Sequence, residues 1–277
     1  MHVHREFLDV FRHHHLESLD AIMSIHDGLL IRDMPGRTTR RIILPSPDGP
    51  PLVAFLKQYE PDHVGLWERL LRWLGRREQR EADQEWRMLH TLRQHGIRTA
   101  TPIAFGQAAG GTRAVRSFVM TVEIGGGQPS HKFWQTHDRP SRRALIEALA
   151  VFTRRLHGQG FIHKDYYMPH IFVVERDGQL DLHLVDLQRV MGPARFRQRW
   201  IIKDLGGMAF SAARNGVSRA DMMRFYKTCF QVDRLGADDR KLIRKILARA
   251  ARIRRHKPRY GAPPPPITPL SASGQTN

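Results

Sequence analysis

The sequence predicts an α+β fold with two lobes, a small β-rich lobe followed by a larger, mainly helical lobe. Residues 27–59 contain three strand-like segments separated by glycine and proline turns. Residues 141–156 and 200–213 show the apolar spacing of amphipathic helices. With 277 residues, the chain is long enough to bury a full core across both lobes.

The small lobe is expected to span residues 1–122 and to begin with a helix over residues 1–26, whose apolar side chains fall on one side. A turn containing Gly36 joins two of the expected strands, and a positioning helix follows the third strand. The expected strands of this lobe are residues 28–32, 38–44, 52–59, 103–105 and 117–122.

Two charged residues of this lobe fall on faces that are otherwise apolar. Lys57 shares one face of the third strand with Val53, Phe55 and Tyr59. Glu85 belongs to the apolar stripe of the helix expected over residues 81–95. A buried charge is costly without a partner, so Lys57 requires an acidic group or a phosphate. Glu85 requires a cation.

The second lobe is expected over residues 129–260, after a glycine-containing hinge at residues 123–128. An ordinary glycine loop is the alternative for those six residues. Helices are expected at residues 141–156, 200–213 and 239–257, and Ser218 begins a further helix with a capping box. Residues 261–277 lack core-forming side chains and are expected to form a disordered tail.

Two acidic residues lie in unusual positions in the middle of this lobe. Asp165 follows the end of a helix, in the sequence His163-Lys164-Asp165. A strand at residues 171–174, an Asp-Gly turn and a returning strand at residues 182–187 come next. Alternation places Asp186 on an apolar face of the returning strand, where a carboxylate needs a cation or a metal ion.

This order of features resembles the catalytic segment of protein kinases. His163-Lys164-Asp165 stands where kinases have His-Arg-Asp, and Asp186-Leu187-Gln188 stands where they have Asp-Phe-Gly. His170 takes the place of the usual asparagine, five residues after Asp165. With this histidine and Leu187, the sequence is similar to the lipopolysaccharide core kinases, which phosphorylate heptose or Kdo sugars. The similarity covers about residues 27–230 and includes residues 34–38, 85–87, 199–205 and 210–211.

The resemblance implies a protein-kinase-like fold and phosphoryl transfer from ATP, with Mg²⁺, to a sugar hydroxyl. Asp165 would accept or orient the proton of that hydroxyl, with His163 in the same catalytic motif. Asp186 would hold Mg²⁺. His170 would either be a second metal ligand or only shape the loop, since Mg²⁺ prefers oxygen ligands.

The resemblance also implies a nucleotide site between the lobes. Lys57 would hold the α- and β-phosphates and would be oriented by Glu85, which fits the helix register better than Glu78 or Glu81. The other expected nucleotide contacts are Gly36, Arg37, Glu123 and Ile124.

Two further residues of the catalytic segment depart from or extend the kinase pattern. Tyr167 stands where serine/threonine kinases have a lysine, so Arg189 or Lys164 would meet the charge of the γ-phosphate. Asp204 would brace the catalytic loop from its helix.

The formal net charge of +18 predicts an anionic partner. Nucleic acid is not expected, because no zinc-finger, RRM or KH pattern is present. Residues 67–80 form a basic amphipathic stretch that suits either an anionic membrane surface or an ordinary solvated helix. The resemblance implies a lipid-linked core oligosaccharide as substrate and acyl carrier protein as a partner.

The sequence predicts a cytoplasmic protein, and the resemblance implies that it is peripheral on the cytoplasmic face of the inner membrane. No apolar run approaches the roughly 18 residues of a membrane span, and the first residues lack the apolar segment of a signal peptide. Cys229, the single cysteine, excludes an internal disulfide and fits a reducing compartment.

Three other functions are compatible with parts of the sequence. A kinase-like enzyme could act on another acceptor, such as an antibiotic or a protein. A non-catalytic, anion-binding pseudokinase is disfavoured because Lys57, Glu85, Asp165 and Asp186 are all present. The His163-x-Asp165 spacing also occurs in non-haem Fe(II) oxygenases, but the helical surroundings do not fit their β-barrel.

Overall fold

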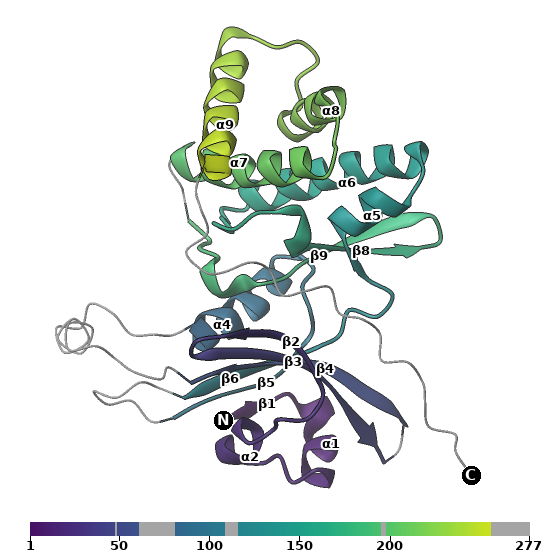
Figure 1. Cartoon of the computed structure of the whole chain (residues 1–277), viewed down its shortest axis with the longest axis vertical. Helices are drawn as coiled ribbons and strands as arrows, with labels where there is room; N and C mark the ends of the chain where they lie inside the picture. Colours follow the sequence, from purple (N-terminus) through teal and green to yellow (C-terminus); the bar gives the residue numbers. More distant parts are fainter. Residues whose placement is uncertain (48, 61–80, 109–115, 195–197, 256–277) are drawn as a thin grey trace, which may run out of the picture.

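The computed structural model describes residues 1–47, 49–60, 81–108, 116–194 and 198–255. Figure 1 shows a lobe built on a large sheet and a lobe built on helices, with α4 (Glu81–Gln94) between them. The predicted α+β architecture with a β-rich first lobe and a mainly helical second lobe is therefore confirmed.

The small lobe is built on an antiparallel sheet with the strand order β1-β5-β6-β4-β3-β2. Its strands are β1 (His2–Val3), β2 (Leu29–Met34), β3 (Arg37–Ser46), β4 (Gly49–Tyr59), β5 (Pro102–Gln107) and β6 (Ser117–Val122). All the predicted strands are present. β3 and β4 extend further than predicted, because they pair with each other from Arg37↔Tyr59 to Ser46↔Gly49.

The two faces of this sheet are covered by different helices (Figure 1). On one face, Ala54 and Leu56 pack with Phe11 of α1 (Leu8–His13) and Ile22 of α2 (Leu19–Met23). Gln58 follows them on the same face, and its buried amide donates to backbone carbonyls at the end of α2. The alternate residues of β4 point to the opposite face, toward α4 and the interlobe cleft.

The single helix predicted over residues 1–26 is wrong. The chain instead forms β1, the short helix η1 (Arg5–Phe7), α1 and α2. His15 has a φ of 54°, a left-handed conformation that ends helical geometry after α1. The break lets α1 and α2 both pack against the curved sheet, which one straight helix could not follow.

The large lobe contains a helical bundle and a small sheet. Its elements are α5 (Ser130–Thr136), α6 (Arg139–Gly158), α7 (Gln198–Arg214), α8 (Arg219–Phe230), α9 (Ala237–Arg255), and a sheet of β7 (Gln128–Pro129), β8 (Ile171–Arg176) and β9 (Gln179–Leu184). Two short helices flank β8 and β9: η2 (Met168–His170) and η3 (Leu187–Arg189). The helix start predicted at Ser218 is confirmed, because its hydroxyl caps α8 by accepting from the Asp221 amide at 3.1 Å.

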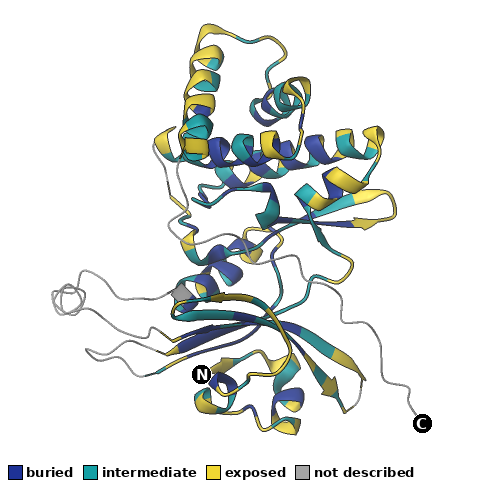
Figure 2. Cartoon of the chain, viewed as in Figure 1, coloured by how far each residue is buried: buried dark blue, intermediate teal, exposed yellow. Residues whose placement is uncertain are grey.

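One hydrophobic core continues from the large lobe into the cleft. Leu145, Leu149 and Leu156 of α6 are buried together with Leu89 and Leu92 of α4. Figure 2 shows this buried band along α6, α7 and α4. The core therefore fixes α4 as the helix that faces both lobes.

Several expectations are settled by burial or fall outside the described residues. Cys229 is buried as predicted, and burial raises the pKa of its thiol to about 12. The basic stretch at residues 67–80 and the tail at residues 261–277 lie outside the described residues. Among the described helices, none combines the length and apolar character that a membrane crossing needs.

Candidate active site

The ion pair between Lys57 and Glu85 is present in the interlobe cleft. The Lys57 ammonium lies 2.6 Å from Glu85 Oε1. The Glu85 carboxylate is almost fully buried, and the Tyr59 hydroxyl donates to its other oxygen at 3.3 Å. Lys57 and Tyr59 come from the same face of β4, and Glu85 comes from α4. The strand and helix periods predicted both inward faces, and the resemblance to kinases predicted that the two residues pair.

Asp186 lies close to this pair, but not on the strand where alternation placed it. β9 ends at Leu184, and Asp186 adopts a left-handed conformation, with φ 60° and ψ 58°, just before η3. This turns its carboxylate toward the cleft. Its Oδ1 lies 3.4 Å from Lys57 Nζ and 3.4 Å from an Arg37 nitrogen.

The charges around Asp186 keep it ionised. Burial opposes ionisation, but Lys57, His170 and Arg37 more than offset this and hold the pKa of Asp186 well below its ordinary range. The His170 Nε2 atom lies 3.8 Å from Asp186 Oδ2. The carboxylate is thus available as an anionic ligand within a positively charged surround.

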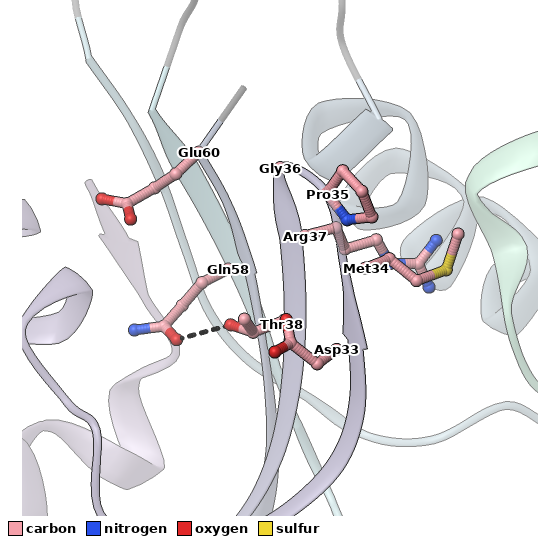
Figure 3. Close-up of a pocket in the computed structure, with 8 residues that line it drawn as sticks. All are labelled: Asp33, Met34, Pro35, Gly36, Arg37, Thr38, Gln58 and Glu60. Carbon is pink, nitrogen blue, oxygen red and sulfur yellow. Dashed lines mark hydrogen bonds between the residues drawn. The ribbon is translucent and has the colours of Figure 1, made fainter. Parts of the chain in front are cut away.

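Arg37, the first residue of β3, connects the β2–β3 turn to Asp186 and Gln188. Gly36 has a φ of 73°, which glycine adopts without strain, and the next residue returns along β3. The Arg37 guanidinium donates to Gln188 Oε1 at 2.6 Å as well as reaching Asp186. Figure 3 shows Met34 and Arg37 on one side of this turn and Gln58 and Glu60 on the other.

Asp204 of α7 holds the catalytic loop, which is the segment that carries His163, Lys164 and Asp165. The buried Asp204 carboxylate accepts hydrogen bonds from the backbone amides of His163 and Lys164, both at 2.8 Å, and lies 3.2 Å from His157 Nε2. Lys164 has a φ of 68°, so the loop is held in a turn that most residues avoid. The predicted bracing contact of Asp204 is confirmed.

Asp165 faces the cleft from the other end of this loop. The Arg189 Nη1 atom lies 3.0 Å and 2.9 Å from the two carboxylate oxygens of Asp165. The His170 Nδ1 atom lies 2.7 Å from the backbone carbonyl of Asp165. Because a carbonyl only accepts, Nδ1 carries the proton and Nε2 faces Asp186.

His163 lies behind the loop and not in the cleft. Its side chain is fully buried, and Nε2 donates to the Val185 carbonyl at 3.0 Å, next to Asp186. Nδ1 is buried without a hydrogen-bond partner among the described residues. Burial and the nearby His170 lower the pKa of His163.

The two expected hinge residues differ in what they expose. The Glu123 carboxylate accepts two hydrogen bonds from Arg41, at 2.6 and 2.9 Å. Its side chain is therefore already paired, and only its backbone is left for a nucleotide. Its amide donates to Val53, and the Ile124 carbonyl accepts from Gly127. Among the described residues, the Glu123 carbonyl and the Ile124 amide have no backbone partner.

The structure adds Tyr59 and Gln188 to the predicted site residues. The Tyr59 hydroxyl reaches Gln188 Oε1 at 3.2 Å as well as Glu85. The position of Tyr59 on the face of Lys57 was a usable signal. Nothing in the sequence around Gln188 indicated that it would join the two lobes.

Asp186 and His170 form a pair of candidate metal ligands and not a complete coordination sphere. No group of three or more histidine, cysteine or carboxylate side chains suited to a metal ion occurs in the described parts of the chain. Asp186 and His170 are the nearest approach to one. Such a pair leaves most of the coordination positions to other ligands, as a metal bound together with phosphate oxygens requires.

Comparison with known proteins gives one consistent result. The profile of the lipopolysaccharide kinase (Kdo/WaaP) family matches residues 63–229. The lipopolysaccharide core heptose(I) kinase WaaP of Pseudomonas aeruginosa is 30% identical over 192 residues, which cover 65% of this chain and 71% of that protein. The heptose(I) kinase WaaP of Escherichia coli K12 is 28% identical over 191 residues, with coverages of 65% and 72%.

A solved structure of WaaP in complex with acyl carrier protein has the same fold. It superimposes with a TM-score of 0.68 and 25% identity, covering 91% of this chain and 98% of that one. The matched family region contains Glu85, Asp165 and Asp186. The structure places Glu85 and Asp186 beside Lys57, whereas Asp165 pairs with Arg189. The chain therefore belongs to the lipopolysaccharide kinase (Kdo/WaaP) family.

Proposed function

We propose that the protein is an ATP-dependent kinase that phosphorylates a hydroxyl of heptose or Kdo in the inner core of lipopolysaccharide. The observation that carries this proposal is the convergence of Lys57, Glu85 and Asp186 from three separate elements, with Asp165 at the end of the braced loop. The relatives named above are heptose(I) kinases, which favours heptose.

The nucleotide would lie between the β2–β3 turn and the interlobe connection. The Lys57 ammonium uses one N–H on Glu85 and a second on Asp186, which leaves the third for a phosphate oxygen. Arg37 and the backbone at Gly36 would cover the phosphates from the small lobe. The carbonyl of Glu123 and the amide of Ile124 offer one acceptor and one donor to the edge of the adenine ring.

The donor set fits a metal held mainly by Asp186. Magnesium, when bound, would neutralise part of the phosphate charge. The ionised Asp186 carboxylate is a ligand of the type that Mg²⁺ prefers, whereas His170 Nε2 is a nitrogen donor that suits it poorly. We therefore assign His170 chiefly to shaping the loop, through its hydrogen bond to the Asp165 carbonyl.

At the acceptor end, Asp165 would orient the attacking hydroxyl and accept its proton. Arg189, which holds both Asp165 oxygens, lies where it could also meet the charge of the transferring phosphoryl group. The Lys164 ammonium lies over the Trp200 ring, so we assign that role to Arg189 first. His163 would act as a positioning residue, because its buried ring contacts the Val185 carbonyl.

The lobes would move about residues 123–128, with residues 1–122 and 129–260 as the two bodies. Residue 128 already belongs to β7, so the bending would concentrate at Gly125, Gly126 and Gly127. Glycines there allow the backbone rotation that lobe closure requires.

The proposed activity is tested by incubating the protein with Mg²⁺, labelled ATP and dephosphorylated core oligosaccharide. Mass spectrometry would then locate the phosphate. Phosphate on a heptose or Kdo hydroxyl is the expected result. Transfer to protein side chains only, or no transfer to any core sugar, would refute the proposed acceptor.

Acyl carrier protein is the protein partner we propose. The net charge of +18 favours an acidic partner. An apolar cavity of about 680 Å³ between α6, α7, α8 and α9 would receive an acyl chain. Its lining includes Met208, Met222 and Leu247, with Arg219 and Arg254 among the charged members.

We also propose that the protein works on the cytoplasmic face of the inner membrane. A lipid-linked substrate presents anionic groups at a surface, and a strongly basic protein is attracted to such a surface. Salt-sensitive flotation with anionic vesicles tests this. The arginines of residues 67–80 are the first candidates for substitution.

A further inference from the structure

A group of three cations lies beside the catalytic loop. Lys164, Lys203 and Arg249 come from the loop, α7 and α9, and none of them forms an ion pair with another described residue. The ammonium groups of Lys164 and Lys203 lie 5.7 Å and 5.6 Å from the centre of the Trp200 ring. The Arg249 Nε atom is buried and lacks a hydrogen-bond partner within the described residues.

These cations influence one another, and the charge of Asp165 acts on Lys164 and Lys203. Burial, followed by Arg189, lowers the pKa of Lys164. Burial, followed by Arg189, Lys164 and Arg249, lowers the pKa of Lys203, while Asp165 acts in the opposite direction. Like charges held this close indicate a site that gains from an added anion.

α7 contains two adjacent glycines where it packs against Arg249 of α9 and against the catalytic loop. Gly206 and Gly207 lie inside α7, where glycine weakens a helix relative to alanine. A side chain at Gly206 would collide with the stem of Arg249, and one at Gly207 would meet the Tyr166 carbonyl and the Tyr167 ring. The paired glycines therefore let α9 and the catalytic loop approach each other across α7.

This cluster is separate from the cations of the nucleotide side. The charges that act on Asp186 come from Lys57, His170, Arg37 and His163. Those that act on Lys203 come from Arg189, Asp165, Lys164 and Arg249, and the two sets share no member. Asp165 marks the boundary between them, so the cluster lies on the side of the acceptor.

We propose that Lys164, Lys203 and Arg249 form an anion-binding subsite for the acceptor. It takes an acidic substituent, a carboxylate or a phosphate, carried by the sugar chain close to the hydroxyl that Asp165 orients. This inference rests on the proposed function and names the class of acceptor. A neutral sugar chain would leave the cations uncompensated, so the enzyme would select acidic glycans.

The test uses the full-length protein and core oligosaccharide freed of its acyl chains. Three forms are compared: intact, with carboxylates reduced to alcohols, and treated with phosphatase. Calorimetry with a non-hydrolysable ATP analogue measures binding, and initial rates give KM and kcat. The form that alone loses affinity identifies the carboxylate or the phosphate as the ligand.

Lys203→Gln should weaken binding of the intact oligosaccharide about tenfold, as loss of a charge-assisted hydrogen bond does. The same variant should bind the form lacking the acidic group as the wild type does. Lys203→Arg should restore most of the affinity, and Arg249→Gln should act in the direction of Lys203→Gln. Lys245→Gln is the matched control, because Lys245 is exposed on α9.

Equal weakening on all three forms, no effect of Lys203→Gln, or no binding of the intact form by the wild type would each overturn the subsite. Transfer by the wild-type protein reports on the proposed function separately. A protein that binds with the predicted charge dependence but transfers nothing refutes the kinase activity. One that transfers with an unchanged KM after Lys203→Gln refutes the subsite alone.

Discussion

At the level of single residues, the two carboxylates of the cleft have different surroundings. Asp186 is held by Lys57 and Arg37 from the small lobe, and Asp165 is held by Arg189 of its own lobe. Closing or opening the lobes therefore changes the environment of Asp186 more than that of Asp165. This matches a division of work between metal binding and orientation of the acceptor.

Asp165→Asn and Asp186→Asn should each lower the rate of transfer by at least about 100-fold, the usual contribution of a proton-accepting or metal-binding group. Both variants should remain folded, because asparagine has the same size. Phosphate incorporation and circular dichroism measure the two outcomes. Near-wild-type turnover in either variant would remove that residue from the mechanism.

His163 gives the protein a pH-dependent stability. Its pKa is lowered in the folded state, so below the pKa of an unfolded histidine, about 6.5, the unfolded chain binds a proton that the folded protein does not. The free energy of unfolding should therefore fall as the pH drops through this value. The ring faces His170, Asp204 and Asp186, and the two carboxylates oppose the shift only in part.

His163→Gln keeps an N–H donor for the Val185 carbonyl and removes the titration. The slope of unfolding free energy against pH should decrease by up to about 1.4 kcal/mol per pH unit below pH 6.5. Urea unfolding at a series of pH values measures it. The control is His13→Gln, at an exposed position of α1; an equal change there would contradict the assignment to His163.

At the level of elements, α7 determines the shape of the catalytic loop through Asp204. Asp204→Asn leaves one acceptor oxygen and turns an amide N–H₂ toward a backbone N–H. The protein should lose about 1–3 kcal/mol of unfolding free energy, and the amides of His163 and Lys164 should exchange hydrogen faster. Asp138→Asn is the control, because Asp138 is an exposed cap of α6 and asparagine caps equally well.

Chemical denaturation and hydrogen exchange together test this prediction. A variant with unchanged stability and unchanged exchange at the loop would show that Asp204 does not brace it. A loss of stability with unchanged loop exchange would place the effect at His157 instead.

The elements that the sequence predicted well have a strong period. The alternation in β4 located Lys57 opposite the buried Ala54 and Leu56, and the stripe in α4 located Glu85. These two periods predicted that each charge needs a partner, and the resemblance to kinases predicted that the two residues, 28 positions apart, pair with each other. Local patterns are reliable here because each element buries one face only.

The features that the sequence did not predict depend on contacts between elements. The left-handed conformation of Asp186, which moves it off its strand, is held by the surrounding cations and by η3. His15 breaks the first helix in the same conformation. Gln188 enters the site because Arg37 and Tyr59 reach it from the other lobe. No period in the sequence encodes such contacts.

At the level of the whole molecule, the lobes meet through α4 and the cleft. Gln84 of α4 donates to the Val190 carbonyl at 2.8 Å, and Arg37 reaches Gln188. A partner that binds the large lobe alone would leave these contacts free to open and close. The apolar cavity between α6, α7, α8 and α9 lies in that lobe, so a partner bound there would leave the contacts between the lobes unobstructed.

If acyl carrier protein uses this cavity, a charge at its edge should block the association. Leu247 lines the cavity and is 52% exposed, so Leu247→Glu should leave the fold intact. The new carboxylate would repel both an acyl chain and an acidic partner. Affinity for palmitoyl-loaded acyl carrier protein should fall at least about tenfold, since a buried charge without a counterion costs well over the 1.4 kcal/mol that tenfold represents.

Val151→Glu is the matched control, because Val151 is 45% exposed on α6 and does not line the cavity. It adds the same charge to the same lobe, so both variants reduce the long-range attraction equally. Raising the salt concentration should weaken both complexes by screening that attraction. Only Leu247→Glu should abolish the preference for the acyl-loaded over the unloaded carrier. If the wild type shows no such preference, or if both variants lose affinity alike, the carrier is held by surface charge and the cavity is not its acyl site.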